Sequence, residues 1–429
     1  MLLGFSAFLF LLLFGAPIVF ALGVSSLAIL TLVMDVPVSV VSQRLYAGLD
    51  SFTIMAIPFF VLAGILMDAG GISRRMVQLA DALVGWITGS TLLVAVSAAT
   101  GMAAVSGSGS ADTAAISAIM QPEIKRRKFD PDFAAAMIAA GGSLASVIPP
   151  SLMMVVIASI ANISVGQLFM AGIVPGFLTG IGLMFMCYLY ARQKGGHYLE
   201  VTPFSMARLT SSFVQALPAM GLPFLIIGGI VGGVFTPTEA AAVAVLYGLI
   251  VGVFVHRELK LSSLPKLLLK ASAISASVMI ILASASIFSW LISLARVSTA
   301  VGELIQSLSS DPLVFLLLVN VLLLVVGMFM ESIAAMLILV PVLLPLAIAY
   351  GIDPVHFSLV VVFNLTIGFV TPPYGIALYV AANIAGRGVM QVASQSGRSL
   401  LVLLTVLLLI TYVPEIGMWL PDLFFKKHD

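Results

Sequence analysis

The stretch Val147-Ile-Pro-Pro-Ser151 places two adjacent prolines in the middle of an apolar block that runs from 133 to 161. A proline donates no backbone hydrogen bond and its ring clashes with the preceding turn, so we expect a broken helix at this point. The break leaves backbone carbonyl groups unpaired, and in hydrocarbon these groups need another chain segment, water or an ion as a partner. This stretch is therefore a candidate functional site.

The same proline pattern occurs twice in the chain. The first copy contains Pro122, Asp130-Pro131 and Pro149-Pro150, and the second contains Pro345, Asp353-Pro354 and Pro372-Pro373. The successive intervals are 8 and 19 residues in both copies. Gly101-Met102 precedes the first copy as Gly327-Met328 precedes the second. Agreement at several positions in the same order indicates an internal duplication.

A short turn-forming stretch precedes each proline pair. Val105-Ser-Gly-Ser-Gly-Ser-Ala-Asp112 interrupts one apolar block, and Gly327-Met-Phe-Met-Glu-Ser332 interrupts another. Glycine and serine favour a turn over a continuous helix, so each stretch is expected to form the tip of a helical hairpin. A hairpin tip that carries hydroxyl groups, facing a broken helix with unpaired carbonyl groups, offers oxygen ligands to a desolvated Na⁺ ion. We therefore predict two cation sites, one in each copy.

Backbone carbonyl and hydroxyl groups would form most of these two sites. The first predicted site comprises Ser106, Gly107, Ser108, Ser110, Asp112, Val147, Pro149 and Ser151, and the second comprises Gly327, Glu331, Ser332, Gly368, Thr371 and Pro372. Asp112 has an alternative interpretation as the N-cap of the second hairpin helix. Glu239, in Phe235-Thr-Pro-Thr-Glu239, is interpreted as a helix cap because it follows Thr236-Pro237.

Arg296 is the candidate partner for a carboxylate substrate. It lies near the end of an apolar block, and its guanidinium group would bind a carboxylate through two hydrogen bonds. The alternative is an arginine that extends outward to the membrane surface. The predicted substrate-binding residues are Arg296, Ser108, Gly109, Ser151, Thr371, Tyr374 and Asn383.

The composition is that of an integral membrane protein. Of the 429 residues, 61% are hydrophobic and 9% are charged, far from the roughly 25% charged residues of a soluble domain. The basic residues form no stripe for a nucleic acid, and the single cysteine, Cys187, excludes a disulfide framework and an iron–sulfur cluster. No catalytic motif stands out, so we expect neither an enzyme nor an organic cofactor.

The fold class expected is an all-α membrane protein with inverted-topology repeats. Most of the 19 Lys and Arg residues fall in a few clusters, which the positive-inside rule assigns to the cytoplasm. The segments around 125–128 and 257–270 would then be cytoplasmic, and the loops at Asp311 and Asp353 and both termini would lie outside. The two hairpins would enter the membrane from opposite faces, as in many secondary transporters.

Four segments are expected along the chain. The first repeat covers 1–165, with scaffold helices at 2–34, arm helices at about 40–50 and 72–83, a hairpin at about 86–127 and a broken helix at about 132–162. A connecting helix and a cytoplasmic loop cover 166–212. The second repeat covers 213–390, with scaffold helices at 213–255, arms at about 259–269 and 297–308, a hairpin at about 312–350 and a broken helix at about 354–387. A final helix and a periplasmic tail cover 391–429.

Five motifs carry a resemblance to a known family. They are Asp50-Ser-Phe-Thr-Ile-Met-Ala-Ile-Pro-Phe-Phe60, Ser106-Gly-Ser-Gly-Ser-Ala-Asp112, Ile148-Pro-Pro-Ser151, Phe235-Thr-Pro-Thr-Glu-Ala-Ala-Ala242 and Thr371-Pro-Pro-Tyr-Gly375. With these motifs, the chain resembles the large membrane subunit of tripartite ATP-independent periplasmic (TRAP) transporters over essentially its whole length.

The resemblance implies Na⁺-driven uptake of an organic acid, such as a C4-dicarboxylate or a sialic acid, across a bacterial inner membrane. It implies two or more co-transported Na⁺ ions and an elevator movement of the hairpin-bearing domain. It also implies two protein partners, a periplasmic substrate-binding protein and a small four-helix membrane subunit. The chain starts at its own first helix, so the small subunit is expected to be separate, and lipid would cover other apolar surfaces.

Two other functions stay open at this point. A proton or cation antiporter-type subunit of a larger complex also uses broken helices in inverted repeats, but its proton path needs several charged residues within the membrane. Only Asp112, Glu239, Arg296 and Glu331 are available in the apolar blocks. A passive channel would differ from a carrier by showing no coupling to a Na⁺ gradient.

Overall fold

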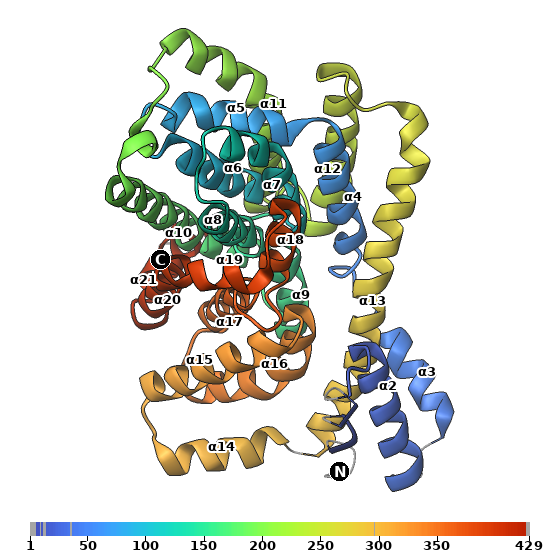
Figure 1. Ribbon diagram of the computed structural model, residues 1–429. Helices are drawn as coiled ribbons and strands as arrows, with labels where there is room; N and C mark the ends of the chain where they lie inside the picture. Colours follow the sequence, from blue (N-terminus) through green and yellow to red (C-terminus); the bar gives the residue numbers. More distant parts are fainter. Residues whose placement is uncertain (1–5, 9, 12–13, 35–36, 296, 426–429) are drawn as a thin grey trace.

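The computed structural model describes residues 6–8, 10–11, 14–34, 37–295 and 297–425, and within these ranges the regular structure is entirely helical (Figure 1). Six of the described helices are long and apolar enough to cross a membrane, or up to nine if each of three sharply bent helix pairs counts as one span. The expected all-α membrane fold with broken helices is therefore confirmed.

The helices of the first half are α2 (Ile18–Ala28), which continues as the π-helix η1 (Ile29–Val33), α3 (Val38–Ala47), α4 (Ala56–Ala69), α5 (Ile72–Val84), α6 (Ser90–Ser106), α7 (Gly109–Arg126), α8 (Pro131–Ser143), η2 (Leu144–Ser146), α9 (Leu152–Ala161), α10 (Val165–Lys194) and η3 (Gly196–Leu199). The hairpin α6–α7 is followed by α8 and α9, which are separated by the first proline pair.

The second half contains α11 (Met206–Val231), α12 (Pro237–Ile250), the π-helix η4 (Val251–Val255), η5 (Leu261–Ser263), α13 (Leu264–Leu294), α14 (Val297–Leu308), α15 (Pro312–Phe329), α16 (Ser332–Ala349), α17 (Pro354–Gly368), α18 (Ile376–Ala385), α19 (Val389–Gln395), α20 (Gly397–Tyr412) and α21 (Glu415–Phe425). The hairpin α15–α16 and the broken helix α17–α18 repeat the order seen in the first half.

Each broken helix begins at an Asp-Pro pair. The Asp130 carboxylate accepts a hydrogen bond from the Asp132 N–H at 3.0 Å, and the Asp353 carboxylate accepts one from the Val355 N–H at 2.7 Å. Aspartate is a favoured N-cap, and proline is suited to the first helical position because no N–H partner is needed there. The repeated Asp-Pro motif therefore sets the start of α8 and α17.

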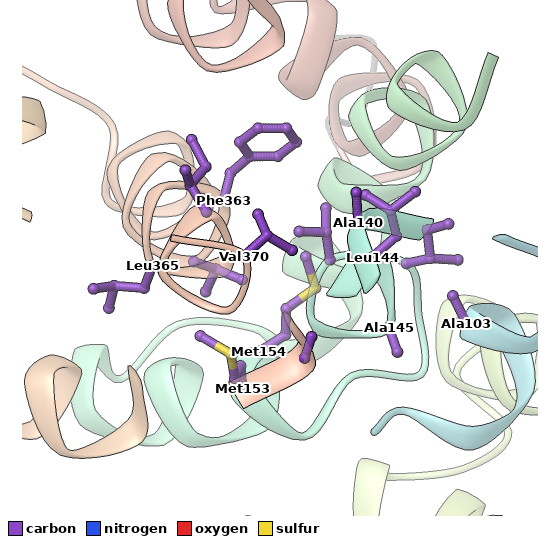
Figure 2. Close-up of a cluster of buried hydrophobic side chains, with 14 of the residues drawn as sticks. Ala103, Ala140, Leu144, Ala145, Met153, Met154, Phe363, Leu365 and Val370 are labelled. Atoms are coloured by element: carbon purple, nitrogen blue, oxygen red, sulfur yellow. The ribbon is translucent and has the colours of Figure 1, made fainter. Parts of the chain in front are cut away.

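The two repeats share one hydrophobic core. Helix α18 packs against α7 and α8, and α9 packs against α16 and α17. Figure 2 shows Met153 and Met154 of α9 near Leu365 and Val370 of the second repeat, with Ala140 and Leu144 of the first repeat beside them. The hairpins and broken helices therefore form a single packed body.

A long helix lies at the side of this body. In Figure 1, α13 runs along one edge of the molecule, with α2 and α3 at one end and α4 beside it. Helix α13 contacts α2, α3, α4 and α16, and α4 in turn packs along α12.

A bidentate ion pair joins the two repeats. Arg387, which follows α18, donates hydrogen bonds from Nε and Nη2 to the Asp132 carboxylate of α8, both at 2.6 Å. Close by, the Gln121 side chain of α7 donates to the Ala385 carbonyl at 3.2 Å. The first broken helix thus begins where the second one ends, as inverted repeats require.

We expect Arg387→Gln to lower the melting temperature slightly, because a partly exposed ion pair with two parallel hydrogen bonds adds a small stabilisation. Thermal melting of the detergent-purified protein measures the effect. Lys266→Gln, which removes an exposed positive charge from α13, is the control. Equal melting temperatures for the two variants would show that the pair adds no stability.

Candidate functional site

The first hairpin tip forms the predicted turn. Helix α6 ends at Ser106, Gly107 has a left-handed φ of 65°, and Ser108 is extended before α7 begins at Gly109. The Ser108 N–H donates to the Ser106 hydroxyl at 3.1 Å. Glycine adopts a positive φ without steric cost, so the chain reverses direction at Gly107.

This tip lies directly against the first helix break. A Cβ atom on Gly107 would be 2.6 Å from the Pro150 carbonyl oxygen, and one on Gly109 would be 3.2 Å from the Ser143 Cα. The tip also meets α4, because a Cβ on Gly64 would be 2.7 Å from the Ser106 carbonyl oxygen. Three glycines therefore allow the backbones of the tip, the break and α4 to approach closely.

Asp112 is the most unusual side chain of this region. It is 1% exposed, and neither carboxylate oxygen has a hydrogen-bond partner among the described residues. Ser108 occupies the N-cap position of α7, so the alternative interpretation of Asp112 as that N-cap is wrong.

A cavity of about 120 Å³ leads to Asp112. Ser106 and Ser108 of the hairpin tip line it, together with Asp68 at the end of α4 and Lys270 of α13. Asp68 and Lys270 are both exposed, and no pattern in the sequence predicts that they lie near Asp112. The buried carboxylate therefore lines a cavity whose wall is mostly apolar and whose other polar groups come from α4, the hairpin tip and α13.

Ser151 forms hydrogen bonds with residues on both sides of the first break. The Ser151 hydroxyl donates to the Ser146 carbonyl at 2.6 Å and accepts from the Met154 N–H at 3.3 Å, so it spans the break and caps α9. The Val147 carbonyl oxygen lies next to Gly172 of α10.

The second tip also meets its break. A Cβ atom on Gly368 would be 2.5 Å from the Gly327 carbonyl oxygen. The Ser332 hydroxyl donates to the Leu365 carbonyl at 3.1 Å, and the Tyr374 N–H donates to the Met328 carbonyl at 3.0 Å. The structure thus brings together the tip and the break that the sequence paired in each repeat.

Two acidic residues cap helices. Glu331 is the N-cap of α16 and accepts from the Ala334 N–H at 2.9 Å. Glu239 forms a capping box with Thr236 at the start of α12, as predicted. Glu331 therefore caps α16 through this hydrogen bond and also lies at the second hairpin tip, as the sequence predicted.

The remaining predicted residues are more scattered. The Thr371 hydroxyl donates to the Ile367 carbonyl at 2.7 Å within the second break. Asn383 is exposed near the end of α18, and Ser110 lies in the first turn of α7. Arg296 lies outside the described residues.

A buried amide network was not predicted. Asn364 of α17 donates to the Asn320 side-chain oxygen of α15 at 2.9 Å, and Asn320 donates to the Thr411 hydroxyl of α20 at 2.9 Å. All three side chains are at most 3% exposed. The sequence signal that could have predicted this network is the presence of single polar residues within apolar blocks, because buried polar groups in a membrane need a partner.

Comparison with known proteins identifies the family. The family model described as the DctM component of the tripartite ATP-independent periplasmic transporter matches residues 5–416. The isethionate TRAP transporter permease protein DctMQ of Oleidesulfovibrio alaskensis is 42% identical over 97% of this chain, which spans only 65% of that protein's length. The C4-dicarboxylate TRAP transporter large permease protein DctM of Rhodobacter capsulatus is 38% identical over 98% of each chain.

Two further comparisons agree in sequence and in fold. The sialic acid TRAP transporter large permease protein SiaM of Vibrio cholerae is 37% identical over 96% of each chain. The crystal structure of the Alcanivorax borkumensis YdaH transporter has a TM-score of 0.62 and covers 90% of each chain at 15% identity, which shows a likeness of fold alone. Because the family model spans nearly the whole chain and these relatives match it from end to end, the chain belongs to the DctM family of TRAP transporter large permeases, multi-pass proteins of the bacterial inner membrane.

Proposed function

We propose that this chain is the membrane permease of a secondary transporter that takes up an organic acid anion together with Na⁺. The names of the relatives support an anionic substrate, because isethionate, C4-dicarboxylates and sialic acid all carry a negative charge. The observation that supports a cation most directly is the buried Asp112 carboxylate, which has no hydrogen-bond partner beside a hydroxyl-bearing turn.

The environment of Asp112 suits a small hard cation. A charged side chain within the membrane costs at least roughly 2.5 to 3.5 kcal/mol unless it is compensated. A bound Na⁺ would neutralise the carboxylate and would accept further oxygen ligands from the tip, as cations do at unwound backbone in transporters. The cavity lined by Ser106, Ser108 and Asp68 gives an ion a route to this position.

The second cation site is proposed between Gly327–Ser332 and Gly368–Pro372. The Gly327 carbonyl lies within van der Waals range of Gly368, and Glu331 brings a second carboxylate to the tip. The carboxylates of Asp112 and Glu331 would balance the charges of these two cations, so other groups would have to match the charge of the substrate. The N-terminal ends of α9 and α18 would add partial positive charge, and Arg296 stays a predicted partner for the carboxylate.

The proposal includes an elevator movement, and the way the helices pack supports it. The two hairpins and the two broken helices share one core, so they would move as a unit. Helices α2, α3, α4, α12 and α13 lie at the side of this unit and would form the fixed scaffold. Exposed apolar side chains on α2, including Phe20, Val24 and Leu27, would face the small membrane subunit or lipid.

The proposal is tested in proteoliposomes that contain this chain with its small membrane subunit and an organic-acid binding protein. An inward Na⁺ gradient is expected to drive uptake of a labelled C4-dicarboxylate, isethionate or sialic acid, and replacing Na⁺ by K⁺ should abolish it. Uptake that follows a proton gradient and ignores Na⁺ would contradict Na⁺ coupling. Equilibration without concentration would instead indicate a channel.

A further inference from the structure

A second polar pocket lies at the base of the first hairpin, at the opposite end from the tip. It has a volume of about 590 Å³ and is bounded by α5, the start of α6, the end of α7 and the start of α11. This size is typical of ligand-binding pockets. The pocket is separate from the cavity that leads to Asp112.

The pocket carries more positive than negative charge. Arg126, Arg127 and Arg208 line it, together with the carboxylates of Glu123 and Asp81. Glu123 is shared by two arginines, with contacts of 2.7 Å to Arg126 and 2.5 Å to Arg127. Arg208 approaches Asp81 only at 3.4 Å. Three guanidinium groups and two carboxylates leave a net charge of +1 for a ligand to neutralise.

Two hydrogen-bond donors in the pocket lack partners among the described residues. Thr91 is 3% exposed, and its hydroxyl group makes no hydrogen bond although it lines the pocket. The buried Nε atom of Arg208 is also without a partner. A buried donor without a partner destabilises the folded protein, so an acceptor at this place would be stabilising. Thr91 lies in the first turn of α6, where backbone N–H groups favour an anion.

Neighbouring aromatic residues place the pocket at the level of the lipid headgroups. Thr202, which lines the pocket, donates from its N–H to the Gly85 carbonyl at 2.9 Å. Trp86, which follows Gly85 in the chain, is exposed, and its ring packs edge-on against the ring of the exposed Phe204. Exposed tryptophan and other aromatic side chains gather at membrane–water interfaces. The arginines around the pocket belong to segments that the positive-inside rule assigns to the cytoplasmic side.

An apolar surface continues from the mouth of the pocket. Ser212 and Gln215 of α11 line the pocket, while Phe213, Val214 and Leu217 of the same helix turns are exposed. Acyl chains would pack on these exposed side chains while a headgroup occupied the polar pocket.

We propose that the pocket binds the phosphate group of an anionic phospholipid, with the acyl chains along the exposed face of α11. The phosphate oxygens would accept hydrogen bonds from Thr91, Arg127 and Arg208. Basic pockets between membrane helices on the cytoplasmic side bind anionic headgroups in this way. Because Arg127 lies next to the end of α7 and Arg208 lies on α11, the lipid would join the hairpin base to α11.

The test measures phosphatidylglycerol that remains bound to the purified protein after delipidation, by native mass spectrometry, and its affinity in a titration against phosphatidylcholine. Wild-type protein is expected to retain phosphatidylglycerol selectively. Arg208→Gln should weaken binding by about tenfold or more, as expected for the loss of a charge-assisted hydrogen bond. Thr91→Val should weaken it by about fivefold without loss of stability, because it removes an unpartnered buried hydroxyl.

Lys125→Gln is the matched control, because it removes one positive charge from the same end of α7, is exposed and lies outside the pocket. It should bind phosphatidylglycerol as the wild type does. Inorganic phosphate and glycerol phosphate are the soluble probes. Equal affinity for glycerol phosphate and phosphatidylglycerol would overturn the lipid assignment in favour of a free anion. The proposed site would be overturned if Lys125→Gln and Arg208→Gln lost the same amount of bound phosphatidylglycerol. It would also be overturned if Thr91→Val bound phosphatidylglycerol as tightly as the wild type.

Discussion

Replacing Gly368 by alanine is expected to destabilise the folded permease by on the order of 3 kcal/mol, the upper range for overpacking a tight contact. The new Cβ would lie 2.5 Å from the Gly327 carbonyl oxygen and 3.0 Å and 3.2 Å from the carbonyl carbon and Cα of the same residue. These are backbone atoms, so no side-chain rotation relieves the overlap. The second hairpin tip would have to move away from the broken helix, and the proposed second cation site would open.

Thermal melting and Na⁺-driven uptake of the Gly368→Ala protein measure this effect. Gly228→Ala is the control, because Gly228 lies within α11 and a Cβ there meets no heavy atom within 4 Å. Alanine is favoured over glycine in a helix by about 1 kcal/mol, so the control should melt at the wild-type temperature or above. A Gly368→Ala protein with wild-type melting and uptake would contradict the close approach of the tip and the break.

The helix ends and breaks were predictable because their causes are local. Asp130-Pro131 and Asp353-Pro354 cap and start helices through atoms within three residues of each other. The pairs Pro149-Pro150 and Pro372-Pro373 interrupt helices because proline lacks an N–H donor. Such effects need no knowledge of distant parts of the chain.

The pairing of each tip with its break was predictable for a different reason. The duplication showed that a glycine-rich turn and a proline pair recur together, and the structure places Gly107 against Pro150 and Gly327 against Gly368. The exact bonds were not predictable. The Ser151 hydroxyl group donates to the Ser146 carbonyl and accepts from the Met154 N–H of its own segment. These two bonds depend on the path of the backbone through the break.

The surroundings of Asp112 could not be predicted from the sequence. A carboxylate in the first turn of a helix either accepts hydrogen bonds from the backbone N–H groups of that turn or points toward a neighbouring segment. Tertiary packing decides between these two arrangements. Here the close approach of α4 at Gly64 encloses the tip, and α13 brings Lys270 to the same cavity. The network of Asn320, Asn364 and Thr411 likewise depends on three helices that are far apart in the sequence.

Asp112→Asn is expected to abolish Na⁺-dependent uptake, by at least about 100-fold, while folded protein is retained. The amide has nearly the same shape as the carboxylate but carries no charge, so a cation loses its strongest ligand, worth about 3 kcal/mol or more. The substitution also removes an unpaired charge from a position that is 1% exposed. Melting temperature without Na⁺ should therefore stay at the wild-type value or rise.

A Na⁺ titration of thermal stability separates loss of the cation site from loss of the fold. A ligand that binds only the folded state raises the melting temperature as its concentration exceeds the Kd, so Na⁺ should stabilise the wild-type protein and should stabilise Asp112→Asn less, through the second proposed site alone. Asp311→Asn is the matched control, because Asp311 caps α15 at an exposed site through the Leu313 N–H at 2.8 Å. Asparagine caps a helix as well as aspartate does, so this variant should keep the full response to Na⁺.

The same titration distinguishes a Na⁺ ligand from a proton carrier at Asp112. If the carboxylate carried a proton, Asp112→Asn would keep the wild-type stabilisation by Na⁺, and uptake would follow the pH gradient. If the carboxylate were only a structural group, Asp112→Asn would keep wild-type uptake. A Na⁺ ligand predicts a third outcome, in which Asp112→Asn shows a reduced stabilisation by Na⁺ and no uptake, while Asp311→Asn keeps both. Only this outcome supports the cation site, because a general loss of folding would lower the melting temperature even without Na⁺.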